Sequence, residues 1–106
     1  MATFDEREKG FEGKFAHDEE FEFKVTARRN RLLGLWAAEE MNLAGEDAEA
    51  YAKDVIISDF ERPGDEDVFE KVWGDLQAKA PGISEDQLRR KMEVLRGDAR
   101  EQLKAE

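Results

Sequence analysis

Cysteine is absent from this chain of 106 residues, and histidine occurs only once. The first absence excludes disulfides, thiol chemistry and thiolate metal sites, and the second excludes a histidine-based triad or a histidine-rich metal site. The longest uncharged run, residues 32–38, is far shorter than the roughly 20 residues of a membrane span. No secretion signal is recognisable. We therefore expect a soluble, cytoplasmic protein that is not an enzyme, requires no metal and does not insert directly into a membrane.

Charge is abundant but unevenly distributed along the chain. The net charge of −10 argues against a nucleic acid as partner. Residues 1–22 carry a net charge of −5, and residues 23–38 carry four bases and no acid. Residues 39–70 then carry −10, and residues 71–106 carry +1. A basic segment beside an acidic one in a small domain predicts complementary contacts within the fold first and steering of a partner second.

The chain after residue 17 has the apolar spacing of four amphipathic helices, with steps of three and four residues. These helices are expected over residues 18–42, 46–61, 65–80 and from Ser84 onward. Asn42 and Gly45 supply stop signals, Pro63-Gly64 and Pro81-Gly82 break the chain again, and Ser84 and Gln87 form a capping box. The expected inward-facing residues are Phe21, Val25, Leu32, Leu35, Trp36, Leu43, Ala48, Tyr51, Ala52, Val55, Ile56, Phe60, Val68, Phe69, Val72, Trp73, Leu76, Leu88, Met92, Leu95, Ala99 and Leu103.

Short connections allow little except mostly antiparallel neighbours, so these helices can bury their apolar faces together only as a bundle. The predicted fold is therefore all-α, with a four-helix bundle over residues 18–106. A mobile, intrinsically disordered N-terminal arm over residues 1–17 precedes it.

The arm contains an aromatic stripe. On a helical wheel, Phe4, Phe11 and Phe15 fall within an arc of about 40°. Charges of opposite sign flank this arc, with Arg7 and Lys14 on one side and Asp5, Glu8 and Glu12 on the other. Such a surface suits a groove that has an apolar floor and oppositely charged walls.

Two glycines weaken the same segment. Gly10 and Gly13 together cost about 2 kcal/mol of helix stability relative to alanine, and a helix this short is marginal on its own. We therefore expect the arm to be mobile when free and helical when held. From the residues alone two interpretations stay open: the stripe binds a partner, or it folds back as a lid over a gap between the helices.

Two long stretches resemble a known family. FDEREKGFEGKFAHDEE at residues 4–20, followed by FEFKVTARRNRLLGLWAAE at residues 21–39, resembles the alphaproteobacterial zeta subunit, the small inhibitor of the F1Fo ATP synthase. That family was formerly catalogued as a domain of unknown function. The most specific parts are residues 14–20 and 27–38, and the resemblance covers essentially the whole chain, including AEAYAKDV at residues 48–55 and the Ser84 capping box.

The resemblance implies a four-helix bundle whose N-terminal arm enters an α/β catalytic interface of F1 and blocks rotation in the hydrolysis direction. The implied partners are the alpha, beta and gamma subunits of F1-ATPase, so the protein would sit peripherally at the inner membrane through F1. The positions that match the family's partner-binding residues are Phe4, Asp5, Arg7, Phe11, Lys14 and Phe15. With this resemblance, the partner-binding interpretation of the arm is favoured.

This chain also departs from the family pattern. Positions 10 and 13 more often hold better helix formers than glycine, and Phe21-Glu22-Phe23 replaces a stretch that usually contains leucine. Because glycine raises the cost of ordering the arm, the departures predict weaker inhibition.

Three other features are candidate sites. Arg28, Arg29 and Arg31 are candidate nucleotide or anion contacts. Arg28 is expected inside the apolar arc, where a cation needs a carboxylate or a ligand. We favour pairing of these arginines with the carboxylates of residues 39–70, which we call the acidic block. No glycine-rich phosphate loop is present, so no cofactor is expected beyond weak ATP or ADP binding. The alternative function is accordingly a nucleotide-binding or sensing bundle. An assembly factor that does not block turnover is a further alternative.

His17 is either an ordinary capping or surface residue or a candidate pH sensor at the hinge of the arm. The acidic run Asp65-Glu66-Asp67 lacks the pattern of a calcium loop and fits the positive end of a helix dipole instead.

Overall fold

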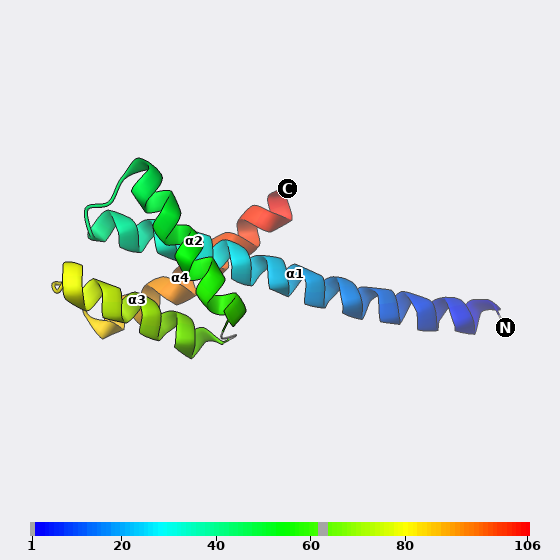
Figure 1. Cartoon of the computed structure of the whole chain (residues 1–106). Coiled ribbons are helices and arrows are strands. Elements are labelled where there is room, and N and C mark those ends of the chain that lie inside the picture. Colours follow the sequence, from blue (N-terminus) through cyan, green and yellow to red (C-terminus); the bar gives the residue numbers. More distant parts are fainter. Residues whose placement is uncertain (1, 62–63) are drawn as a thin grey trace.

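The computed structural model describes the backbone of residues 2–61 and 64–106 and the side chains of residues 19–61 and 64–106. Within these residues the chain forms four helices: α1 (Ala2–Glu40), α2 (Gly45–Glu61), α3 (Asp65–Lys79) and α4 (Glu85–Ala105). Helices α2, α3 and α4 gather around the C-terminal half of α1, and the N-terminal half of α1 extends beyond them (Figure 1). The predicted all-α fold of four packed helices is confirmed. None of the described helices has the length and apolar character needed to cross a membrane.

Helix α1 begins earlier than predicted, at Ala2 instead of Asp18. The arm and the body therefore share one continuous helical backbone, and Asp18 is an interior residue of α1 and not its N-cap. Apart from the two glycines, the first 17 residues are mainly glutamate, lysine, arginine, alanine and phenylalanine. Several of these favour helix strongly, so the local preference does not change at Asp18.

The end of α1 follows the predicted stop signal. Asn42 adopts the left-handed conformation with φ of 64°. The Leu43 amide donates to the Ala38 carbonyl at 2.8 Å, and the Asn42 amide donates to the Glu39 carbonyl at 3.0 Å. These two hydrogen bonds form a Schellman motif, which provides donors for carbonyls of the last helical turn that have no partner within the helix.

The start of α4 also follows its predicted chemistry. The Gln87 amide donates to Ser84 Oγ at 3.1 Å, and the Ser84 amide donates to Gln87 Oε1 at 2.8 Å. Both halves of the capping box are therefore formed.

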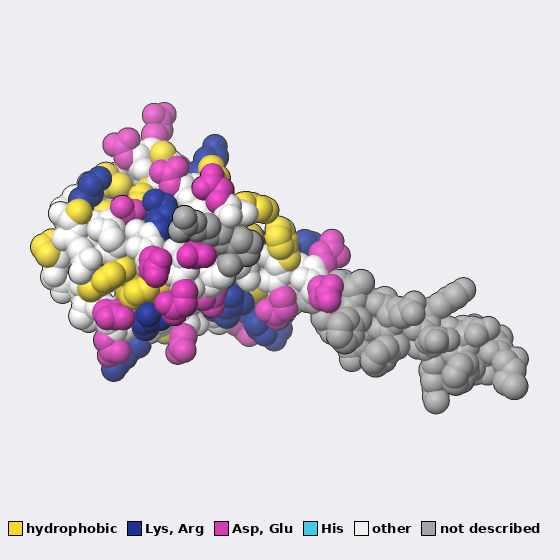
Figure 2. All heavy atoms as spheres, turned by 60° about the horizontal axis from the view of Figure 1, so that its bottom comes forward, with side chains coloured by type: hydrophobic (Ala, Val, Ile, Leu, Met, Phe, Trp, Pro, Cys, Tyr) yellow, Lys and Arg dark blue, Asp and Glu magenta, His cyan; other side chains and the backbone are white. Residues whose placement is uncertain are grey.

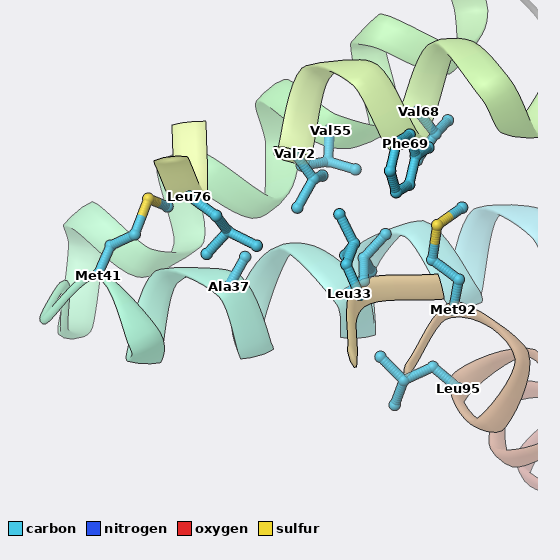
Figure 3. Packing of buried hydrophobic residues seen from close by; sticks show 11 residues of the cluster. Leu33, Ala37, Met41, Val55, Val68, Phe69, Val72, Leu76, Met92 and Leu95 are labelled. Carbon is cyan, nitrogen blue, oxygen red and sulfur yellow. The ribbon is translucent and has the colours of Figure 1, made fainter. Parts of the chain in front are cut away.

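The hydrophobic core lies where α1 meets α3, α4 and the middle of α2. Leu33 of α1 points toward Val72 and Phe69 of α3, with Met92 of α4 beside them (Figure 3). The buried cluster comprises Leu33, Ala37, Met41, Val55, Val68, Phe69, Val72, Leu76, Leu88, Met92 and Leu95.

The inner face of α1 differs from the prediction. The prediction placed Phe21, Leu32, Leu35 and Trp36 inward, but all four are only half-buried. Val25 is buried as predicted, and the other buried apolar residues of this helix and its end are Leu33, Ala37, Ala38 and Met41, which the prediction did not include. The reason is a close approach of two helices, because a Cβ on Gly34 would lie only 2.6 Å from Ala52 Cα of α2. Small residues at this contact turn α1 away from the orientation that its largest side chains suggest.

Phe60 was also predicted to face inward, and this was wrong. It lies in the last turn of α2 and is 64% exposed. Its ring contacts that of Phe23 on α1 edge to face, with the centroids 6.0 Å apart.

Candidate partner-binding site

The predicted partner-binding residues lie on the N-terminal part of α1. Their side chains are outside the described residues, and so is that of His17. The backbone path is nevertheless defined, because α1 is continuous from Ala2 to Glu40. At about 1.5 Å per residue, residues 2–18 form a helical segment roughly 25 Å long. This segment gives the molecule its extended shape of 63 × 25 × 23 Å.

Ion pairs fix α1 to α4 just after the arm. Glu22 accepts from Arg100 at 3.0 Å and lies 3.7 Å from Arg96, and both arginines belong to α4. About two turns further along α1, Arg28 donates to Gln102 at 2.9 Å and pairs with Glu106 at the C-terminal end of α4. Each exposed pair contributes little stability alone. Together they join α1 to α4 along the stretch of α1 that follows the arm.

A buried arginine joins α1 to the start of α3. Arg29 is only 1% exposed. Its Nε donates to Asn30 Oδ1 and its Nη2 donates to Asp65 Oδ1, both at 2.9 Å. The hydrogen bond from Arg29 lowers the pKa of the Asp65 carboxyl, and this effect outweighs the opposing effect of partial burial. A buried guanidinium needs such a carboxylate, because an uncompensated buried charge is strongly destabilising.

The three arginines predicted as candidate anion contacts engage separate carboxylates. Arg29 pairs with Asp65, whereas Arg31 donates to both carboxylate oxygens of Glu49 on α2, at 2.9 and 3.2 Å. Both carboxylates belong to the acidic block, as favoured from the sequence. Arg28 instead pairs with Glu106, and it is Arg29, not Arg28, that lies on the buried face. The prediction missed by one position because it centred the inner face on the larger side chains.

A hollow lined mainly by charged side chains lies between α1, α3 and α4 and has a volume of about 350 Å³. Arg89 donates to Glu66 there at 3.0 Å, which lowers the pKa of the Glu66 carboxyl and raises the pKa of Arg89. The hollow is lined by Arg29, Asp65, Glu66, Arg89, Met92, Glu93 and Arg96. Three guanidiniums and three carboxylates balance each other, which is typical of a structural ion network. Among the described residues, no group of three potential ligands could hold a metal ion.

Sequence reasoning missed the exposed pair of Phe23 and Phe60, because Phe60 completed the apolar stripe of its helix and was placed inward, while Phe23 was assigned no role. The available signal was Phe23 itself, which departs from the family pattern and does not fit the spacing of the other inward positions on α1.

The fold and these surfaces define the class of a small all-α protein, in which ion pairs join one long helix, α1, to α4. A family model described as ATPase inhibitor subunit zeta matches residues 1–102. The chain belongs to the ATPase inhibitor subunit zeta family, whose members are non-catalytic inhibitor subunits. It is therefore an ATPase inhibitor subunit, and binding to the ATP synthase follows from this membership.

A solved structure agrees with this assignment. A solution NMR structure with 47% sequence identity superimposes with a TM-score of 0.69 and covers 78% of this chain and 94% of that one. No curated protein matches the chain.

Proposed function

We propose that this chain inhibits ATP hydrolysis by inserting residues 1–17 as a helix into a catalytic interface between an alpha and a beta subunit of F1, next to gamma. The observation that carries the proposal is that the family match begins at residue 1 and so includes the aromatic stripe. The continuous backbone of α1 supports it, because a helical arm can be presented to a groove without a break at its junction with the body.

The proposed mechanism couples binding to ordering of the arm. Burying Phe4, Phe11 and Phe15 yields about 1.5–3 kcal/mol for each ring. Part of this gain is offset because the arm must be fixed in one conformation, and Gly10 and Gly13 increase that cost. The remainder stabilises the closed catalytic interface around the arm. The next rotation step must open this interface, so the enzyme stops.

The body serves as the anchor in this mechanism. Glu22 and Arg28 join α1 to α4 beyond the arm, and because α1 is continuous the arm leaves the body along the axis of α1. The bundle then remains outside the catalytic interface and limits how far the arm enters.

The test compares the wild-type chain with the double variant Phe11→Ala/Phe15→Ala in an F1 hydrolysis assay. At about 2 kcal/mol for each ring, the concentration for half-inhibition should rise about 1,000-fold. The matched control is Glu6→Ala, on the opposite side of the wheel from the stripe, which should inhibit like the wild type. Undiminished inhibition by the double variant would refute the role of the stripe. A wild-type chain that binds F1 without slowing hydrolysis would instead indicate an assembly factor.

A further inference from the structure

Two exposed aromatic rings lie together on the body, where α1 and α2 are neighbours. Phe23 is 60% exposed and Phe60 is 64% exposed, and their rings meet at an interplanar angle of 62°. Ile57, one turn before Phe60 on α2, is 49% exposed. We name these three residues the aromatic patch. Because large apolar side chains gain free energy from burial, a cluster of them in water marks a candidate contact surface.

The aromatic patch borders a hollow of about 180 Å³. Its lining residues are Phe23, Thr26, Ala27, Asp59 and Phe60. The Thr26 hydroxyl already accepts a hydrogen bond from Arg96 at 3.3 Å. The Asp59 carboxylate accepts from the Gly64 amide at 3.4 Å, and the other lining side chains are apolar, so the hollow suits an apolar side chain better than a polar ligand. Hydrophobic side chains are visible on the end of the body from which the N-terminal segment leaves (Figure 2).

The charges around the aromatic patch indicate what kind of surface it fits. Near Ile57 and Phe60, helix α2 carries three carboxylates, Asp54, Asp59 and Glu61, and one lysine, Lys53. On α1, the exposed Glu19 and Glu20 lie about one turn before Phe23. A second copy of this chain would bring the same acidic surroundings into contact, and like charges would oppose that dimer. A partner with apolar side chains bordered by lysine or arginine fits instead.

The position of the aromatic patch connects it with the arm. Phe23 follows Phe15 by eight residues, which is about 12 Å along a straight helix. It lies about 80° around the helix from Phe15, to the side of the arm's stripe. An F1 subunit whose groove encloses the arm as far as Phe15 would therefore reach the aromatic patch with one wall of that groove.

We propose that the aromatic patch is a second docking site for the F1 subunit that holds the arm, and that it binds an apolar, basic-rimmed surface at the mouth of the arm's groove. This inference rests on the proposed function, because it assigns the partner of the arm to the body as well. The two surfaces have different roles. The arm blocks rotation, whereas the aromatic patch increases affinity and does not change the inhibition reached at saturation.

The test uses the full-length variant Phe23→Ala/Phe60→Ala and measures its dissociation constant for purified F1 and the hydrolysis rate at saturation. Binding to F1 should weaken about 10- to 100-fold, as expected for aromatic anchors. At saturating concentration, the variant should still inhibit ATP hydrolysis fully. The matched control is Val94→Ala on α4, which truncates another exposed hydrophobic residue, 55% exposed. It should bind within about twofold of the wild type.

A charge-reversal variant provides an independent test. Glu19→Lys/Glu20→Lys changes two exposed side chains beside the aromatic patch and should weaken F1 binding about tenfold at low salt, with a smaller effect at high salt. Circular dichroism on both variants checks that the thermal unfolding midpoint is unchanged.

The outcomes separate this inference from the proposed function. If the Phe11→Ala/Phe15→Ala variant loses inhibition while Phe23→Ala/Phe60→Ala binds like the wild type, the aromatic patch is not a docking site and the arm mechanism stands. If the wild-type chain does not bind F1, both fail. If the wild type is a dimer that Phe23→Ala/Phe60→Ala converts to a monomer, the aromatic patch is a self-association surface and the inference is wrong.

Discussion

Replacing Gly34 with alanine tests the close approach of α1 and α2. A Cβ at this position would lie 2.6 Å from Ala52 Cα, 3.2 Å from Ala52 Cβ and 3.3 Å from Val55 Cγ2. The shortest of these contacts is to backbone, so no change of side-chain rotamer can relieve it. Helix α2 would have to move away from α1, and the fully buried Ala52 and Val55 would lose contacts.

The expected destabilisation follows from two opposing effects. Overfilling a packed contact typically costs about 1–3 kcal/mol, and the backbone clash places Gly34→Ala at or above the upper end of that range. Alanine recovers about 1 kcal/mol of helix propensity. We therefore expect the free energy of unfolding to fall by about 2 kcal/mol. For a domain of this size, the thermal midpoint should fall by about 8–16 °C.

The measurement is urea and thermal unfolding followed by circular dichroism. The matched controls are Gly74→Ala in α3 and Gly97→Ala in α4, where an added Cβ meets no atom within 4 Å. Each control should gain about 0.5–1 kcal/mol, since only helix propensity changes. If Gly34→Ala is as stable as these controls, the close approach of α1 and α2 is refuted.

Three further predictions concern the ion network, the arm and a cap. Asp65→Asn should lower the free energy of unfolding by about 1–2 kcal/mol at neutral pH in urea titrations, because it removes the negative charge that faces buried Arg29 but keeps an oxygen that can accept its hydrogen bond. Arg29 lowers the pKa of Asp65 below its unfolded value of about 4. The stability that Asp65 contributes is therefore fully present above about pH 4 and is lost as the pH falls through the folded-state pKa. The Asp65→Asn variant should not show this loss of stability in acid. Under the proposed mechanism, Gly10→Ala/Gly13→Ala should lower the concentration for half-inhibition of F1 about 30-fold, corresponding to about 2 kcal/mol of helix propensity, and unchanged inhibition would contradict ordering of the arm on binding. Ser84→Ala should lower the free energy of unfolding by about 1 kcal/mol through loss of the α4 cap, whereas Ser84→Asp should retain most of it.

The ends of the helices in the body could be predicted from the sequence because their signals are local. Asn42 can adopt the left-handed conformation that closes α1, and Ser84 and Gln87 cap α4 through bonds to each other. Neither depends on how the helices are arranged. The start of α1 at Ala2 was missed for a related reason, since an aspartate preceding acids resembles an N-cap wherever it occurs.

The orientation of α1 could not be predicted in the same way. A helical wheel gives weight to large apolar residues, so Leu35 and Trp36 suggested the inner face. The structure instead brings α2 against Gly34, and this buries Leu33 and Ala37. Close helix contact is a tertiary effect, and the sequence does not indicate which small residue will be used for it.

The charge pattern was predictable as a whole but not in its pairs. The basic segment of residues 23–38 does meet the acidic block, through Arg29 with Asp65 and Arg31 with Glu49. The contact of Arg28 with Glu106 joins residues 78 positions apart. It depends on where the C-terminal end of α4 lies beside α1, which local patterns do not determine.

Glycine has opposite consequences at the two ends of α1. At Gly34 the loss of helix propensity is compensated within the chain, because the missing side chain allows α2 to approach. At Gly10 and Gly13, under the proposed mechanism, the compensation has to come from the partner. The stability of the body and the affinity of the arm can therefore be changed independently, although one continuous helix connects them. An inhibitor built in this way can be tuned through its arm without weakening the bundle that anchors it.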